Sequence, residues 1–317
     1  YDNFAYMKKS TRISLLIASA IVVTLAVSCV CFLNIALYND TTFDEDYQYA
    51  RLCEKYPHIT QWVDSIRPLM RDTIITDASD NRLFARYASA SNTSNKTAII
   101  IHGYKSNSIA MMHIGYMFHH DFGYNILLPD LHSHGKSDGR YIQMGWRDKD
   151  DVRRWIDLAI DIFGNNTDIV ITGISMGGAT TMMTSGEKLP SNVKCFVEDC
   201  GYTSVWDEFQ NELAASYHLP AFPLLYLTSA LNKVVNGWSF GEASSLHQVR
   251  NCRLPMMFIH GENDTYVPTS MVYTLYYSKT EPKELYISPG SVHTMSYRDN
   301  PQEYSKRVGE FVTEYCR

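Results

Sequence analysis

The feature that most constrains the fold lies near the middle of the chain, where an apolar run leads into a glycine-rich turn. Residues 169–171 are Ile-Val-Ile, residues 173–177 are Gly-Ile-Ser-Met-Gly, and a helical pattern follows as far as Leu189. Glycine accepts backbone angles that other residues avoid, so the chain can turn sharply here and hold Ser175 at the tip of the turn. We therefore expect a strand, a tight turn and a helix, with Ser175 as a nucleophile.

Four short runs are apolar throughout, as expected for strands that have helices packed against both faces of their sheet. They lie at residues 98–101, 126–128, 169–171 and 256–259. A helical pattern with one apolar stripe occupies residues 148–163, and a hairpin pattern occupies residues 72–87. Strands that alternate with helices predict a doubly wound α/β domain with a mostly parallel sheet and helices on both faces.

The alternation stops at about residues 201–253, where the sequence has helical character and no apolar run typical of a strand. In open α/β sheets, ligands bind at the carboxyl ends of the strands, so an insertion at that edge would cover the pocket as a helical cap. Its aromatic residues favour a hydrophobic acyl or aromatic group in the pocket, although a helical core would have the same composition. These residues are Trp206, Phe209, Tyr217, Phe222, Tyr226 and Trp238.

A serine nucleophile needs a base that takes its proton and a carboxylate that orients the base. In strand–turn–helix hydrolases, the three residues follow one another in the order Ser, Asp or Glu, His. His293 is the one histidine that follows Asp264, and Asp264 lies in a turn-rich loop that follows the apolar run at residues 256–259. We therefore predict His293 as the base and Asp264 as the acid. Asp199 is the alternative acid, and we expect it to have a structural role.

Acyl transfer also needs hydrogen-bond donors for the negative oxygen of the tetrahedral intermediate. One predicted donor is the backbone amide of Met176, at the start of a helix whose dipole favours an anion. The second is the backbone amide of Tyr104, in the loop that follows the run at residues 98–101. His102 in the same loop is expected to form structural hydrogen bonds.

A metal site is the alternative interpretation of one histidine-rich segment. Asp130, His132 and His134 alternate along the chain, and alternate residues of a strand share a face. The glycines that follow them indicate a loop held by hydrogen bonds instead. We therefore predict no metal and no cofactor.

The N-terminal part of the chain differs from the rest because residues 13–39 contain no charged side chain. A helix of this length exceeds the roughly 30 Å thickness of the hydrocarbon layer. Because Lys8, Lys9 and Arg12 precede it, we predict a cytoplasmic segment at residues 1–12, a transmembrane anchor at 13–39 and an extracytoplasmic remainder. A cleaved signal peptide, or a lipoprotein signal processed at Cys29, is the alternative.

The remainder divides into two parts. Residues 40–71 are polar and prone to form helices, so we predict a helical connector there, and residues 72–317 form the catalytic domain with its cap. The net charge is −6, and no basic cluster is present. This charge distribution argues against a nucleic-acid partner, which would require clustered Lys and Arg.

Together these motifs resemble the α/β-hydrolase superfamily, and within it a bacterial group of membrane-anchored or secreted serine hydrolases. The resemblance rests on residues 102–104, 130–139, 173–177 and 198–204, with Asp264 and His293. It implies an eight-stranded sheet, catalysis without a cofactor and an acyl-enzyme intermediate. Tyr104 stands where many lipases have a run of glycines, and this departure argues against esters of bulky tertiary alcohols.

The resemblance covers esterases, peptidases and thioesterases, so the substrate has to come from the site. We predict hydrolysis of a carboxylic ester. The expected partner is the substrate itself, a small-molecule ester or a peptide. An aminopeptidase or dipeptidyl peptidase is the first alternative, and it would need acidic groups in the cap to hold the free amine of the substrate. The candidates are Asp207, Glu208, Glu212 and Glu242. A non-catalytic scaffold is the second alternative, and the complete set of three residues argues against it.

Overall fold

The computed structural model describes residues 9–316, and its centre is one sheet of eight strands in the order β1-β2-β4-β3-β5-β6-β7-β8. The β1–β2 and β2–β4 pairs are antiparallel and all others are parallel. This sheet confirms the predicted fold class, and the predicted hairpin is β1 and β2. The strands are β1 (Arg71–Thr76), β2 (Arg82–Ala88), β3 (Lys96–Ile101), β4 (Asn125–Pro129), β5 (Asp168–Ile174), β6 (Val193–Asp199), β7 (Met256–Gly261) and β8 (Lys283–Ser288).

Side chains that alternate along the strands feed two separate hydrophobic layers, as the pleat of a sheet requires. On β3, Ile99 packs into one layer and Ile100 into the other. The first layer is covered by α5 (Asp148–Phe163), α6 (Met176–Ser185), α9 (Ser245–Asn251) and α10 (Ser270–Ser278). The second is covered by α2 (Glu45–Lys55), α3 (Thr60–Ile66), α4 (Met112–Tyr116) and α12 (Pro301–Tyr315).

Residues 40–71, predicted as a connector, pack onto the domain through α2, α3 and two short 3₁₀ turns. Tyr49 and Trp62 are buried in the second layer. Arg86 of β2 is 1% exposed, and its guanidinium donates to the hydroxyls of Ser108 and Tyr49. Because a buried guanidinium needs such partners, the bond to Tyr49 fixes α2 against β2.

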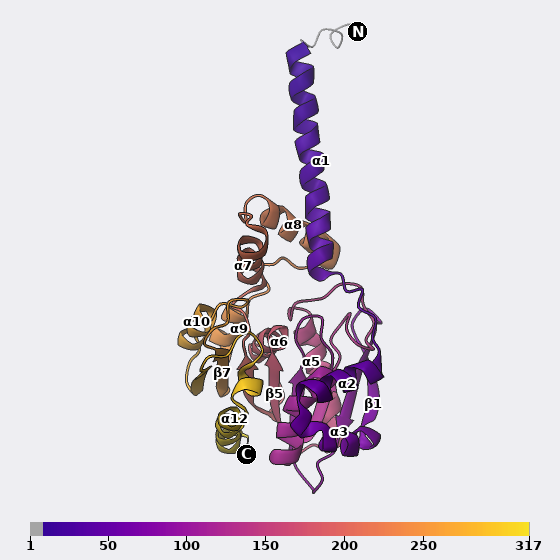
Figure 1. Ribbon diagram of the computed structural model, residues 1–317, viewed down its shortest axis with the longest axis vertical. Helices are drawn as coiled ribbons and strands as arrows, with labels where there is room; N and C mark the ends of the chain where they lie inside the picture. The colour runs from indigo at the N-terminus through magenta and orange to yellow at the C-terminus, as the bar shows by residue number, and fades with distance from the viewer. Residues whose placement is uncertain (1–8, 317) are drawn as a thin grey trace.

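The segment between β6 and β7 forms α7 (Val205–Tyr217), α8 (Leu224–Asn236) and α9. Ser204 caps the start of α7, since its hydroxyl accepts from the backbone amide of Asp207. Figure 1 shows α7 and α8 at the end of the domain from which α1 (Lys9–Leu37) extends, with α8 beside the C-terminal part of α1. These two helices form the cap, and α9 packs on α6.

The long helix α1 has one stretch, Thr11–Leu37, that is long and apolar enough to span a membrane or to serve as a signal sequence. Its last two turns are fixed to the domain, because Leu33 and Leu37 are buried and the carbonyl of Leu37 accepts from the amide of Ile142. The predicted cytoplasmic segment, residues 1–12, falls mainly on residues outside the described part of the chain.

Trp155 of α5 tests how the first layer holds the sheet. Its indole is fully buried, so Trp155→Ala is expected to lower the free energy of unfolding by about 3–5 kcal/mol through lost burial and a residual cavity. The change is measured by chemical denaturation of the detergent-solubilised protein. Arg153→Ala, on the exposed face of the same helix, is the control and should shift stability by less than about 0.5 kcal/mol. Equal shifts for both variants would contradict this assignment of the core.

Candidate active site

Ser175 lies in the turn between β5 and α6 with φ +59° and ψ −119°, a region that side-chain-bearing residues seldom occupy. Such strain persists only where the surroundings enforce it. A Cβ on Gly177 would lie 2.2 Å from the carbonyl oxygen of Ile101, and one on Gly173 would lie 2.3 Å from the oxygen of Gly177. The two glycines therefore allow β3 and β5 to approach the turn closely, as the sequence pattern predicts.

The turn brings Ser175 to His293, which comes from the loop after β8. Ser175 Oγ is 2.9 Å from His293 Nε2, and His293 Nδ1 is 2.7 Å from Asp264 Oδ2 in the loop after β7. All three residues thus lie at the carboxyl edge of the sheet, with His293 within hydrogen-bonding distance of both Ser175 and Asp264. The distances fit a hydroxyl that gives its proton to an imidazole and a carboxylate that orients the imidazole.

Asp264 is 4% exposed and has several partners. Its Oδ1 accepts from the backbone amides of Tyr266 and Val267, and its Oδ2 lies 3.3 Å from His260 Nε2. Burial opposes ionisation of this carboxyl, but the hydrogen bonds from His260 and His293 outweigh burial and lower the pKa of Asp264. The side chain therefore stays a carboxylate near neutral pH.

Asp199, the alternative acid, has different contacts. Its backbone oxygen accepts from the amide of Ser175 at 2.8 Å, and its Oδ1 accepts from the hydroxyl of Ser296 at 3.3 Å. Burial raises its pKa to about 6. The structure thus pairs His293 with Asp264, and Asp199 supports the backbone of the serine turn.

The two predicted oxyanion donors both lie close to Ser175. Met176 begins α6, where the first amides of a helix have no partner within the helix. The loop that carries Tyr104 touches the turn, since a Cβ on Gly103 would lie 3.4 Å from Ser175 Cβ. Tyr104 and Met176 both line a cavity with Ser175.

Two cavities flank the serine hydroxyl. One, of about 270 Å³, is bounded by the end of α1 and by α7, with Phe32, Ala36 and Phe209 among its walls. The other, of about 320 Å³, is bounded by His293 and by Tyr56 at the end of α2. Ser175 therefore lies between an apolar cavity under the cap and a second cavity on the side of the imidazole.

The sequence reasoning missed the part that α1 has in this site. The apolar pattern of residues 13–39 is uniform, and it gave no sign of which side chains face the cavity and which face outward.

The histidine-rich segment that suggested a metal does not present its side chains on one face. Asp130 accepts from the amides of Ser108 and Lys136, and His134 Nε2 accepts from the amide of Lys105. Likewise, His102 Nε2 accepts from the amide of Leu131, and burial lowers the pKa of His102 to about 4. These residues form a hydrogen-bonded loop.

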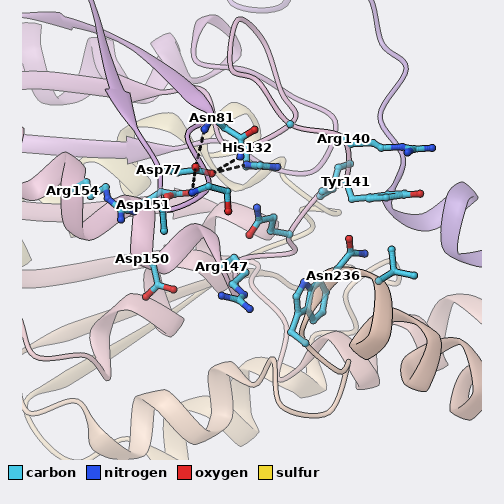
Figure 2. Close-up of a pocket in the computed structure, with 17 residues that line it drawn as sticks. Asp77, Asn81, His132, Arg140, Tyr141, Arg147, Asp150, Asp151, Arg154 and Asn236 are labelled. Carbon is cyan, nitrogen blue, oxygen red and sulfur yellow. Dashed lines mark hydrogen bonds and ion pairs between the residues drawn. The ribbon is translucent and has the colours of Figure 1, made fainter.

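His132 points elsewhere, into a pocket at the turn between β1 and β2. Figure 2 shows His132, Asp77 and Asp151 side by side, with Arg154 next to Asp151. Potential ligand atoms of the first three lie within 4.8 Å of one another, but Asp151 is also 3.4 Å from the guanidinium of Arg154. None of the residues that line this pocket lines a cavity beside Ser175.

The sheet, the strained serine turn and the flanking cavities define a serine hydrolase of the α/β-hydrolase superfamily. Residues 118–317 match the sequence profile of the prolyl oligopeptidase family, and the chain belongs to that family. It is 32% identical over 216 residues to the uncharacterized protein YqkD of Bacillus subtilis. The aligned region covers 68% of this chain and 70% of that protein.

Two solved structures illustrate the range of the fold. An esterase of Pyrococcus furiosus has a TM-score of 0.64 and 24% identity, with 80% of this chain and 96% of the esterase covered. An acylaminoacyl peptidase of Pyrococcus horikoshii has a TM-score of 0.58 and 17% identity, with 80% of this chain and 44% of the peptidase covered. At these identities the likeness shows the fold alone.

Gly177 provides a test of the serine turn. Gly177→Ala would push a Cβ onto the carbonyl of Ile101, so the turn must open and displace Ser175. A displacement of about 1 Å is expected to slow fluorophosphonate labelling roughly 100-fold. Gly241→Ala is the matched control, because a Cβ there meets nothing within 4 Å, and its labelling rate should equal that of the parent protein. Unchanged labelling of Gly177→Ala would contradict the tight approach of β3 to the turn.

Proposed function

We propose that the protein hydrolyses carboxylic esters through an acyl-enzyme, with Ser175 as nucleophile, His293 as base and Asp264 as the acid that orients the base. The observation that carries the proposal is the series of hydrogen bonds from Ser175 through His293 to Asp264, at 2.9 and 2.7 Å. In this arrangement a neutral imidazole can accept the serine proton while the carboxylate stabilises the imidazolium that forms.

The reaction has two steps. Ser175 Oγ attacks the ester carbonyl as its proton passes to His293 Nε2, and the amides of Tyr104 and Met176 stabilise the oxyanion. His293 then donates that proton to the leaving alcohol, the carbon–oxygen bond breaks and the acyl group stays on Ser175. Water attacks the acyl-enzyme with His293 again as base, which releases the acid and restores the serine.

The two cavities correspond to the two halves of the ester. Because His293 has to protonate the leaving oxygen, the alcohol occupies the cavity that His293 lines. The acyl group then occupies the opposite cavity, whose walls include Phe32, Phe209 and Tyr217. Aromatic and aliphatic walls favour a hydrophobic acyl group.

We further propose that α1 remains in the mature protein as a transmembrane anchor, with the cytoplasmic segment at residues 1–12 and the domain outside. A signal sequence would be cut away. The support is that Leu33 and Leu37 are buried against the domain and that Phe32 and Ala36 line the acyl cavity. A cleaved helix would leave both surfaces uncovered.

A peptidase acting on substrates with a free amine is the second candidate, because two acids of the cap lie in the acyl cavity. Glu208 and Glu212 are one turn apart on α7 and both line it with Ser175. The other two candidate acids are engaged elsewhere, since Asp207 accepts from Thr203 and Ser204, and Glu242 pairs with Lys233. Burial raises the pKa of Glu208 to about 8, so this carboxyl is mostly neutral at pH 7.

Ser175→Ala tests the proposed nucleophile. The variant should show no fluorophosphonate labelling and should lose turnover of nitrophenyl esters by at least about 10³-fold, because the acyl-enzyme cannot form. The full chain in detergent micelles is used, with an unchanged near-ultraviolet circular dichroism spectrum as the control for folding. Near-full activity of the variant would rule out Ser175 as the nucleophile.

Glu208→Gln separates the two candidate substrates. If aminoacyl anilides are the substrates, the parent protein should show a bell-shaped pH profile with its maximum near about pH 8, since Glu208 ionises as the substrate amine loses its proton. Glu208→Gln should then lower anilide turnover more than about tenfold relative to turnover of a nitrophenyl ester. Turnover of esters without turnover of anilides would leave the esterase as the one candidate.

A further inference from the structure

Helix α1 has an outer part and an inner part. From residue 11 to residue 28 no side chain is buried, and this stretch is about 27 Å long, close to the thickness of the hydrocarbon layer. Cys29, Leu33 and Leu37 then follow at intervals of four residues, and all three are buried. The outer part has the length of a bilayer, and the inner part lies against the domain.

The cap lies where the inner part begins, and it carries exposed apolar side chains. Phe222 is 72% exposed and Val234 is 84% exposed, and Tyr226, Leu227 and Val235 are also exposed. Figure 1 shows α7 and α8 at the level where α1 leaves the domain. With α1 across a bilayer, the cap helices lie near the membrane surface, where exposed aromatic and aliphatic groups are favourable.

The inner part of α1 also belongs to the acyl cavity. Phe32, Ile35 and Ala36 form its wall on the membrane side. The hydroxyl of Tyr104 donates to the carbonyl of Ala36 at 2.8 Å, which joins the end of the helix to the loop of the predicted oxyanion donor. An acyl chain in this cavity lies directly below the bilayer.

The opposite side of the site is cationic. The cavity lined by His293 adjoins another of about 280 Å³, and the two share Lys55, Tyr56 and Tyr104. Arg51 and Lys105 line the adjoining cavity with Lys55, and Lys105 also lines the acyl cavity. Neither of the two cavities on this side has an Asp or Glu among its described lining residues. Partial burial, followed by the nearby Arg298 and Arg51, lowers the pKa of Lys55, while Asp299 opposes this shift. Arg51 and Lys55 are thus cations that line only the leaving-group side, and Lys105 lines both sides.

Building on the proposed ester hydrolysis, we infer that the substrate is an acyl ester of an anionic membrane amphiphile. The acyl chain occupies the cavity between α1 and the cap, and the alcohol presents an anionic group such as a phosphate to Arg51 and Lys55. Helix α2 carries Arg51 and Lys55, and Figure 1 shows it farther from the free end of α1 than the cap helices are. A lipid at a bilayer surface has the same orientation, with its acyl chain toward the membrane and its headgroup away from it.

The charge of the headgroup is tested with two probes that share one acyl chain. Lauroyl lysophosphatidylglycerol is anionic and monolauroylglycerol is neutral, and the full chain in nanodiscs should hydrolyse the anionic probe with a kcat/KM about tenfold higher. In Arg51→Gln/Lys55→Gln the ratio should fall toward one. Lys306→Gln, an exposed site on α12, is the control and should keep the parent ratio. Equal kcat/KM values in the parent, or an unchanged ratio in the double variant, would overturn the inference.

The membrane-side wall is tested with Ala36→Trp, which places an indole in the acyl cavity. Hydrolysis of nitrophenyl laurate should fall about tenfold relative to nitrophenyl butyrate, because the longer chain needs the space next to α1. Val23→Trp, on the exposed outer part of the same helix, is the matched control and should leave the ratio unchanged. An equal ratio in Ala36→Trp and the parent would show that the chain lies elsewhere and would overturn the inference.

Ester hydrolysis and the anionic lipid substrate are overturned by different results. If the parent protein neither hydrolyses nitrophenyl butyrate nor is labelled at Ser175, the proposed ester hydrolysis itself is overturned. Butyrate turnover that depends on Ser175, without a preference for charge or chain length, would overturn the assignment of the substrate class and leave the proposed hydrolase intact.

Discussion

The site depends on the close approach of two backbones at the serine turn. Ser175 adopts a positive φ, and the turn fits because Gly177 lies against the end of β3 while the carbonyl of Asp199 holds the amide of Ser175 from β6. Three neighbouring parallel strands thus fix one hydroxyl. Since β7 and β8 follow in the same order along the sheet, the loops after them bring Asp264 and His293 to the same edge.

The sequence was sufficient for the parts of the fold that rest on local patterns. Buried parallel strands are apolar throughout, and the serine turn needs glycines at fixed positions, so both are visible in the residues themselves. Chain order left both Asp199 and Asp264 open as the acid, and the turn after the strand favoured Asp264, which lies 2.7 Å from His293. The contacts of α1 were not predictable, because lipid and an apolar cavity select the same side chains, such as Phe32 and Ile35.

The same limit applies to the acids of the cap. A charged residue on a helix is usually solvated, and only the tertiary fold separates Glu208, which is 4% exposed, from Glu242, which pairs with Lys233. The cavity therefore combines apolar walls, which favour an acyl chain, with the carboxyl groups of Glu208 and Glu212, which favour an amine. The raised pKa of Glu208 reduces this conflict, since a protonated carboxyl is compatible with an apolar neighbour.

The hydrogen bond from Tyr104 to Ala36 makes α1 and the catalytic domain one structural unit. The last carbonyls of a helix need partners, and here a tyrosine of the site provides one where water would otherwise do so. A protease that cut the chain just before Asp40 would remove one wall of the acyl cavity and free the Tyr104 hydroxyl at once. Such a cut would therefore change which substrates fit beside Ser175, as well as separating the domain from α1.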